Sequence, residues 1–189
     1  MASVLVPLAD GFEEIEAVTV IDLLRRADID VVVAGLDQGP VSGSHGIVIQ
    51  TDLGLEAALE RDYDMVVLPG GLPGADNLEA DSRIRELLVR MANSGRFTAA
   101  ICAAPKVLAA AGVLENRNAT SFPGFLSTAD VSGLTLSEAS VVVDGRVITS
   151  RGPGTAMDFA LALIEALNGP VARADVEDRL QRPGGVHPA

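Results

Sequence analysis

Aromatic residues are scarce in this chain of 189 residues: they make up 3% of it, and Trp is absent. Because 48% of the residues are nevertheless hydrophobic, the core must consist mainly of Val, Leu, Ile and Ala. This composition is typical of a buried parallel sheet covered by helices. The length suits one domain with a sizeable core and is short for two.

Cysteine occurs once, at Cys102, which excludes an intramolecular disulfide and favours a reducing compartment. No basic and then apolar leader precedes the first predicted strand. Apolar runs such as residues 99–104 and 159–164 end well before the roughly 20 residues that span a bilayer. We therefore expect a soluble, cytoplasmic protein without a membrane partner.

Positive charge is also limited, since the chain has 14 Lys and Arg residues but 26 Asp and Glu residues, which gives a formal net charge of −12. This balance disfavours nucleic acid and anionic membranes as partners. The two histidines, His45 and His187, belong to no cluster of His, Cys and carboxylates at ligand spacing, so we predict no metal site. The patterns typical of serine hydrolases, dinucleotide sites and phosphate loops are absent, and we expect no cofactor.

Short apolar runs alternate along the chain with segments of helical length. The predicted strands cover residues 3–8, 29–36, 47–50, 64–68, 97–101, 119–122, 139–143 and 146–150. The predicted helices cover residues 13–27, 55–59, 82–92, 105–111, 154–167 and 171–180. This order predicts an α/β fold. Since no linker interrupts it, residues 1–182 should form one domain, and residues 183–189 a disordered tail.

Cys102 lies where the apolar strand 97–101 gives way to a helix. Its sulfur should therefore lie at the carboxyl edge of the sheet, where open α/β folds bind ligands. The positive end of a helix dipole there would lower the thiol pKa. A small buried hydrophobic residue is the alternative interpretation, and the local context supports both equally.

Glu16 is the second candidate. At about 100° per residue it falls between Val20 and Leu23 on an apolar side of the predicted helix, where burial would raise its pKa and let it carry a proton near neutral pH. Glu13 points the same way, but at the helix end it can stay solvated. An ordinary acidic first turn is the alternative for both.

The predicted helix 13–27 carries apolar residues around nearly its whole circumference. Such a helix is usually buried on more than one side. We expect one face to pack on the sheet and another on a second copy of the chain, and the alternative is that a loop or hairpin of the same chain covers it.

Gly70, Gly71 and Gly74 follow a core strand, where backbone N–H groups can approach an anion or a developing oxyanion. An ordinary strand-to-helix turn would look much the same. His45, within Gly43-Ser44-His45-Gly46, is better explained as a loop residue than as a general base.

Four segments together resemble the ThiJ/PfpI superfamily, in the branch of the parkinsonism-associated protein deglycase and its bacterial YajL-like relatives. They are Ala9-Asp10-Gly11-Phe12-Glu13-Glu14-Ile15-Glu16-Ala17, Val67-Leu68-Pro69-Gly70-Gly71, Ala99-Ala100-Ile101-Cys102-Ala103-Ala104-Pro105 and Thr149-Ser150-Arg151-Gly152-Pro153-Gly154-Thr155. The resemblance covers about residues 3–182 and implies a flavodoxin-like three-layer sandwich, a homodimer, and Cys102 at a strained strand-to-helix elbow.

The same resemblance implies that Glu16 contacts the reactive sulfur and that the N–H groups of Gly70, Gly71 and Ala103 form an anion pocket. Residues of the segment 149–153, including Ser150, Gly152 and Pro153, would line its rim. The chain departs from animal relatives at two further rim positions, since Phe122 replaces a histidine and His45 an arginine. No Cys/His pair is then expected, and proton transfer falls to Glu16 and water.

The function implied is that of a glyoxalase or deglycase that needs no glutathione and acts on methylglyoxal or early glycation adducts of proteins. Cys102 would be the nucleophile and Glu16 would move protons. A redox-responsive chaperone or stress sensor, acting through oxidation of Cys102, is the rival hypothesis. A binding module with an inert thiol is the third.

Overall fold

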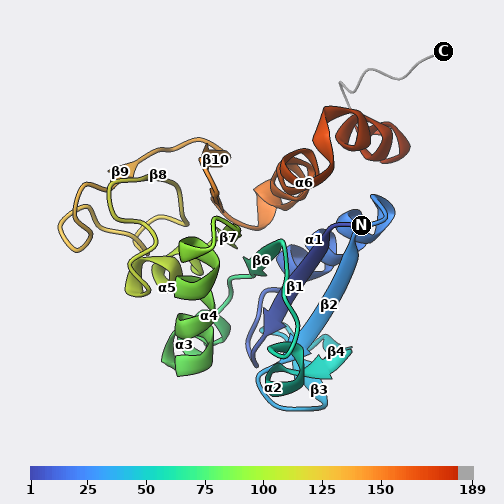
Figure 1. Ribbon diagram of the computed structural model, residues 1–189, viewed down its shortest axis with the longest axis horizontal. Coiled ribbons are helices and arrows are strands. Elements are labelled where there is room, and N and C mark those ends of the chain that lie inside the picture. The colour runs from blue at the N-terminus through green and yellow to red at the C-terminus, as the bar shows by residue number, and fades with distance from the viewer. Residues whose placement is uncertain (183–189) are drawn as a thin grey trace.

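The computed structural model describes residues 1–182. Its strands are β1 (Ser3–Leu8), β2 (Asp30–Gly35), β3 (Pro40–Ser42), β4 (Val48–Gln50), β5 (Leu53–Gly54), β6 (Met65–Leu68), β7 (Phe97–Ile101), β8 (Asn118–Ala119), β9 (Thr135–Leu136), β10 (Val141–Asp144) and β11 (Val147–Ser150). Its helices are α1 (Glu14–Arg26), α2 (Leu55–Ala58), α3 (Gly74–Ala80), α4 (Ser82–Asn93), α5 (Pro105–Ala110), the 3₁₀ turn η1 (Pro153–Thr155) and α6 (Ala156–Arg179). Figure 1 shows how they are arranged.

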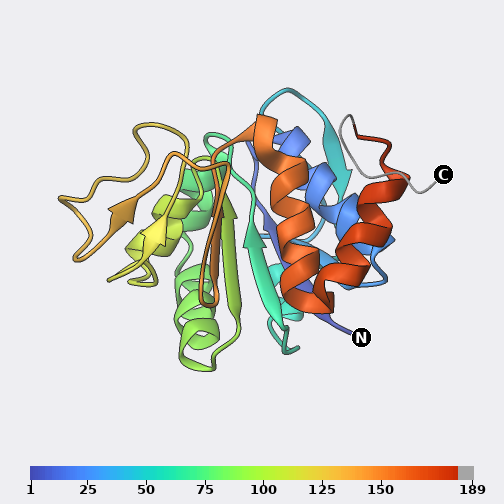
Figure 2. The ribbon, with the colours of Figure 1, turned by 90° about the horizontal axis from the view of Figure 1, so that it is seen from above.

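A seven-stranded sheet in the order β10-β11-β7-β6-β1-β2-β5 forms the middle layer. All neighbouring strands in it are parallel except the pair β10–β11. Figure 2 shows α1 and α6 side by side on one face of the sheet and α4 and α5 on the other. The predicted α/β class and the three-layer arrangement are therefore confirmed.

The two faces of the sheet bury two separate apolar clusters, because successive strand residues point to opposite sides. In β1, Val4 and Val6 belong to the cluster under α1 and α6, whereas Leu5 belongs to the cluster under α4 and α5. In β7, Ile101 and Ala100 divide in the same way. Strands buried on both faces read as continuous apolar runs, which is why the sequence reveals them.

Several predicted elements differ from the structure. The predicted strand 119–122 is reduced to β8, because the N–H of Phe122 leaves the strand ladder and donates to the Cys102 carbonyl over 2.8 Å. Strand β3, which pairs antiparallel with β4, was not predicted. Helix α3, which opens on a glycine without a side-chain cap, was not predicted either.

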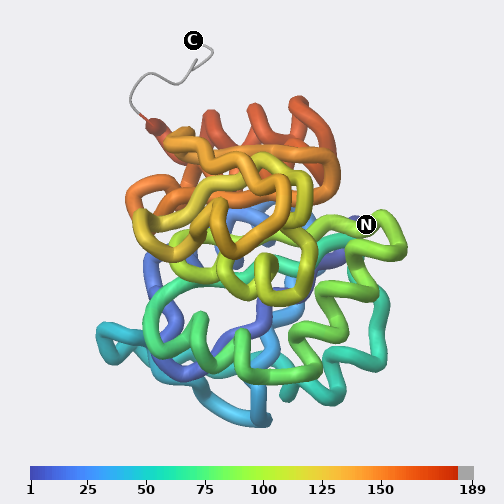
Figure 3. Tube along the Cα trace, turned by 90° about the vertical axis from the view of Figure 1, so that its left-hand side faces the viewer, coloured from blue at the N-terminus to red at the C-terminus, as the bar shows by residue number. Residues whose placement is uncertain are grey.

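Helix α6 contains the two C-terminal helices that the sequence predicts as separate. They meet at Gly169, which has a left-handed φ of 85°, and Pro170 follows. The segment between α5 and β10 folds back and forth at one end of the molecule (Figure 3, yellow to orange). The predicted tail, residues 183–189, lies outside the described residues. Within residues 1–182, no helix is both long and apolar enough to cross a membrane.

Candidate functional site

Cys102 occupies the turn between β7 and α5 with a left-handed φ of 65°. This conformation is unfavourable for a residue with a Cβ atom, and backbone hydrogen bonds hold it in place. The N–H of Cys102 donates to the Ser150 carbonyl over 3.0 Å, and its own carbonyl accepts from the N–H of Phe122. The residue is 9% exposed. The strained elbow expected for the cysteine is therefore present, at the carboxyl edge of the sheet.

Glu16 lies in the first turn of α1 and is 0% exposed, as its place on the apolar side of the helix predicts. Its Oε2 accepts a hydrogen bond of 2.8 Å from the N–H of Gly70. Its Oε1 is buried and has no hydrogen-bond partner among the described residues. The side chain of Glu16 also interacts with the Cys102 thiol, so the structure brings the two candidates together.

Glu13 is only 8% exposed, although a place at the helix end would allow it to stay solvated. It is the N-cap of α1, and its Oε2 accepts a hydrogen bond of 2.8 Å from the N–H of Glu16. The cap satisfies one of the free N–H groups of the first turn. Capping therefore buries Glu13 and fixes the turn that carries Glu16.

The glycine loop after β6 lies directly against the start of α1. A Cβ atom on Gly71 would lie 2.4 Å from the Glu13 nitrogen, and Gly71 has a left-handed φ of 88°, so only glycine fits. The N–H groups of Gly71 and Ala103 donate toward the Cys102 sulfur. The N–H of Gly70 was expected to belong to the anion pocket, but it donates to Glu16 instead.

The pKa values of the pair differ from those of ordinary side chains. Burial raises the pKa of Glu16 to about 7, and this effect outweighs the Gly70 N–H and the Cys102 side chain, which both lower the pKa. Burial and the Glu16 carboxylate raise the pKa of the Cys102 thiol to about 12, although the N–H groups of Gly71 and Ala103 oppose this. The prediction that a helix end lowers the thiol pKa is therefore wrong: burial and a neighbouring carboxylate outweigh the N–H donors.

A shared proton explains how the sulfur can still react. Two negative charges this close repel strongly in a buried site. Once the pair has lost one proton, the remaining one can sit on Cys102 or on Glu16, and the unpartnered Oε1 is the free position for it. Glu16 is thus placed to take the thiol proton when the sulfur attacks.

His45 takes part in a different contact. It is exposed, and its Nδ1 lies 2.9 Å from Oε2 of the buried Glu14. The other Glu14 oxygen accepts from the N–H of His45 over 2.6 Å, and this pairing lowers the Glu14 pKa to about 2 despite its burial. Among the described residues no hydrogen bond or ion pair joins His45 to Cys102.

Glu13, Glu14 and His45 place one ligand atom each within 4.8 Å of one another. This grouping was not predicted from the sequence, because His45 comes from the β3–β4 hairpin and only the fold brings it to α1. Both Glu14 oxygens already accept hydrogen bonds from the hairpin. The contact therefore ties the hairpin to α1, and this role of Glu14 was missed.

The other expected rim residues lie around the elbow. Phe122 is exposed, and a Cβ atom on Gly152 would lie 3.3 Å from its ring. Pro153 begins η1. Ser150 is fully buried, with its hydroxyl against Thr155 Oγ1 at 2.7 Å. Ser150 therefore supports the elbow through its carbonyl and does not line an open rim.

The chain is similar to known proteins along most of its length. A sequence model of the DJ-1/PfpI family matches residues 2–166. Protein dj-1beta of Drosophila melanogaster is 44% identical over 168 residues, which are 88% of this chain and 90% of that protein. A Caenorhabditis elegans protein named glutathione-independent glyoxalase DJR-1.2 is 38% identical over 169 residues, 89% of each chain.

The chain spans less than half of two Arabidopsis thaliana relatives, Protein DJ-1 homologs A and B, covering 43% and 41% of their lengths. Among solved structures, that of Toxoplasma gondii DJ-1, described as oxidized, matches with a TM-score of 0.89 and 36% identity. The match covers 95% of this chain and 98% of that one.

Proposed function

The chain belongs to the DJ-1/PfpI family, and on that premise we propose that it is a cysteine-dependent glyoxalase that converts methylglyoxal to lactate without glutathione. Early glycation adducts on proteins are the second substrate class in this proposal. The observation that carries it is the strained Cys102, whose side chain meets a buried carboxyl group and two N–H donors. A relative named for glutathione-independent glyoxalase activity supports it.

The first step forms a carbon–sulfur bond. Cys102 Sγ attacks the aldehyde carbon of methylglyoxal while Glu16 takes the thiol proton. Glu16 then gives that proton to the aldehyde oxygen, so that a neutral hemithioacetal forms and the carboxylate is regenerated. The N–H groups of Gly71 and Ala103 stabilise negative charge on the sulfur during the attack.

The second step moves a proton between two carbons. The Glu16 carboxylate removes the proton from the former aldehyde carbon, which leaves an enediolate with its negative charge on the former ketone oxygen. The hydroxyl proton then moves from the first oxygen to the second, and Glu16 returns its proton to the former ketone carbon, which leaves a lactoyl thioester on Cys102. The first carbon is oxidised and the second reduced, so the step needs no external oxidant. Water then hydrolyses the thioester, releasing lactate and restoring the thiol.

The covalent intermediate offers a direct test. Wild-type protein mixed with methylglyoxal and quenched in acid should carry one added methylglyoxal unit on Cys102, detected by peptide mass spectrometry. Glu16→Gln lacks the base for both proton transfers, so the adduct should form more slowly and no lactate should appear. Absence of an adduct on Cys102 while lactate forms would contradict the proposal.

A redox role for Cys102 is the second candidate, supported by the structural relative described as oxidized. Dilute peroxide would add oxygens to the sulfur, and the Gly71 and Ala103 N–H groups together with a protonated Glu16 would hold the product. Chaperone activity can be measured by the aggregation of a client protein. Equal suppression by the reduced and the peroxide-treated protein would contradict the switch.

The chain is also proposed to work as a homodimer through α1. Ile15 and Val18 on this helix are 57% and 46% exposed, and Ile47 and Val48 of the neighbouring hairpin are exposed as well. Large apolar side chains gathered on one surface favour burial against a partner. A cytoplasmic location is part of the proposal, since the only cysteine is proposed to work in its reduced form.

A further inference from the structure

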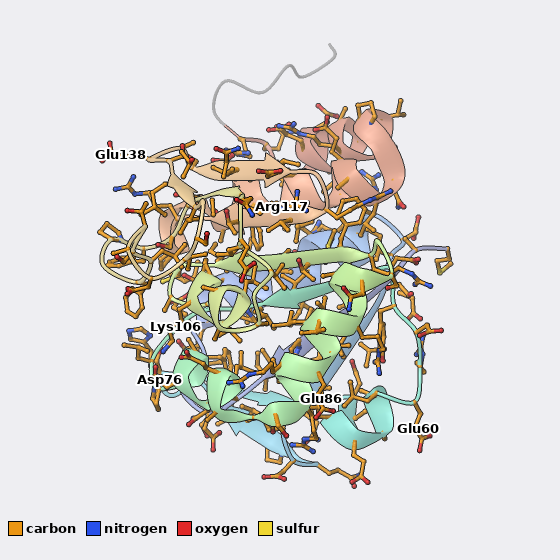
Figure 4. All side chains as sticks on the ribbon, turned by 60° about the vertical axis from the view of Figure 1, so that its left-hand side comes forward. Glu60, Asp76, Glu86, Lys106, Arg117 and Glu138 are labelled. Carbon is orange, nitrogen blue, oxygen red and sulfur yellow. The ribbon has the colours of Figure 1, made fainter. Side chains whose placement is uncertain are left out.

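Lys106 is the only lysine of the chain, and it lies in α5, the helix that follows Cys102 directly. Its Nζ contacts Asp76 Oδ1 and lies 2.9 Å from Glu79 Oε2, both on α3. Figure 4 shows Lys106 and Asp76 next to each other. The lysine side chain is 21% exposed, whereas those of Asp76 and Glu79 are 55% and 36% exposed, so the amine is the more buried partner of both ion pairs.

The two helices that this lysine joins begin beside the site. Helix α3 starts directly after the loop that contains Gly71, and α5 starts at Pro105, two residues after Ala103. Gly71 and Ala103 are the two residues whose N–H groups donate toward the Cys102 sulfur. The distance between α3 and α5 therefore bears on where both donors lie.

Neither helix is stable through its own local interactions. Helix α3 has seven residues and α5 has six, and neither has a side-chain cap. Helices this short are marginal in water and depend on tertiary contacts. Burial lowers the pKa of Lys106, but its hydrogen bonds to Asp76 and Glu79 outweigh this and raise it, so the bridging amine stays charged.

We propose that Lys106 is a positioning residue for Cys102: by tying α3 to α5, it fixes the two loops whose N–H groups donate to the sulfur. The proposal rests on the proposed role of Cys102 as the nucleophile. It does not depend on which carbonyl compound is the substrate. Without the bridge, both donors would shift, and the sulfur would ionise and react less readily.

A direct effect of the lysine's charge on the sulfur is the alternative explanation, and the two make opposite predictions for one variant. The double variant Asp76→Asn/Glu79→Gln removes two negative charges, so a direct field effect would make Cys102 more reactive. Loss of the bridge makes it less reactive. The variant Lys106→Met makes Cys102 less reactive under either explanation, so the double variant decides between them.

The experiment measures the rate at which iodoacetamide alkylates Cys102 at neutral pH, and because this is the only cysteine, every event reports on it. We expect Lys106→Met and Asp76→Asn/Glu79→Gln each to slow alkylation about threefold to tenfold. Lys106→Arg should restore most of the rate. Arg85→Met makes the same charge change as Lys106→Met at an exposed position of α4, where Arg85 forms no ion pair with any residue of the described range 1–182, and it should react like the wild type.

Faster alkylation of the double variant, or wild-type rates in both bridge variants, would overturn the proposal. Thermal unfolding checks that each variant is folded, and if Lys106→Met does not fold, the double variant still decides. Lactate formation is assayed in parallel. A wild type that makes no lactate but whose bridge variants alkylate slowly would refute the proposed function and leave the positioning role standing.

Discussion

The N–H of Gly70 donates a 2.8 Å hydrogen bond to Glu16 Oε2 across 54 positions of sequence. The carbonyl of Gly70 accepts from the N–H of Glu13 over 2.9 Å. Both the N–H and the carbonyl of Gly70 are therefore hydrogen-bonded to the start of α1. A Cβ atom on Gly70 would lie 2.7 Å from Cys102 Cβ and 2.8 Å from Glu16 Oε2. Glycine is therefore what lets the acid and the cysteine approach each other.

Gly70→Ala should separate that pair. The added methyl group forces Cys102 or Glu16 to move, which we expect to lower the free energy of unfolding by about 1–3 kcal/mol and to reduce lactate formation at least about tenfold. Denaturant unfolding and a lactate assay measure the two effects. The control is Gly154→Ala, where a Cβ atom would meet nothing within 4 Å. Equal activities of the two variants would show that the close approach is not needed.

The buried Glu16 should make stability depend on pH. Its pKa is raised from 4.5 to about 7 in the folded protein, so between these pH values the folded state holds a proton that the unfolded state has lost. The contribution of the Glu16 proton to the free energy of unfolding is therefore fully present below about pH 4.5. It is lost as the pH rises through 7. This contribution is on the order of 3 kcal/mol.

Glu16→Gln removes that dependence. Urea unfolding at several pH values gives the free energy of unfolding of each protein. The difference between the two free energies should shift in favour of the variant from about pH 4.5 to 7 and stay constant just above 7. Parallel curves for the two proteins would mean that Glu16 ionises in the folded protein as it does in water.

The reactivity of Cys102 should follow the ionisation of Glu16. In the wild type, alkylation should rise with pH around 7, because the pair must lose one proton before Glu16 can accept another from the thiol. In Glu16→Gln the base is gone while burial still raises the thiol pKa, so the rise should move above the ordinary thiol value of 9.0. Stopped-flow alkylation with iodoacetamide measures both profiles. Coincident profiles would exclude Glu16 as the base.

The proposed dimer can be tested by charging its apolar surface. Ile15→Glu/Val18→Lys keeps the net charge but places two ions on the exposed side of α1, and sedimentation velocity should then show a monomer where the wild type is a dimer. Val89→Glu, at an exposed apolar position of α4 on the other face, should remain dimeric. A monomeric wild type would contradict the proposed dimer.

The fold class and the separate positions of Cys102 and Glu16 were predictable from local patterns, whereas the contact between the two side chains was implied by the family resemblance. A strand buried on both faces reads as an apolar run, and Cys102 ends one such run. Glu16 is buried because helical periodicity places it on the apolar side of α1. Neither inference needs the position of any distant residue.

The raised thiol pKa and the role of Glu14 were not predictable, because both depend on contacts between distant segments. Burial in the folded protein desolvates Cys102, and no local sequence pattern predicts this burial. The partner of Glu14, His45, arrives with a hairpin of which only one strand was predicted. Phe122 leaves its predicted strand for a similar reason, since its N–H is bound by the elbow.

The most direct test of the proposed function is the formation of lactate from methylglyoxal by the purified protein in the absence of glutathione, with Cys102→Ser measured beside it. Wild-type protein should form lactate in catalytic amounts, and the serine variant should form none above the uncatalysed rate, because a serine hydroxyl at this position has a far higher pKa than a thiol. Equal lactate formation by both proteins would contradict the account.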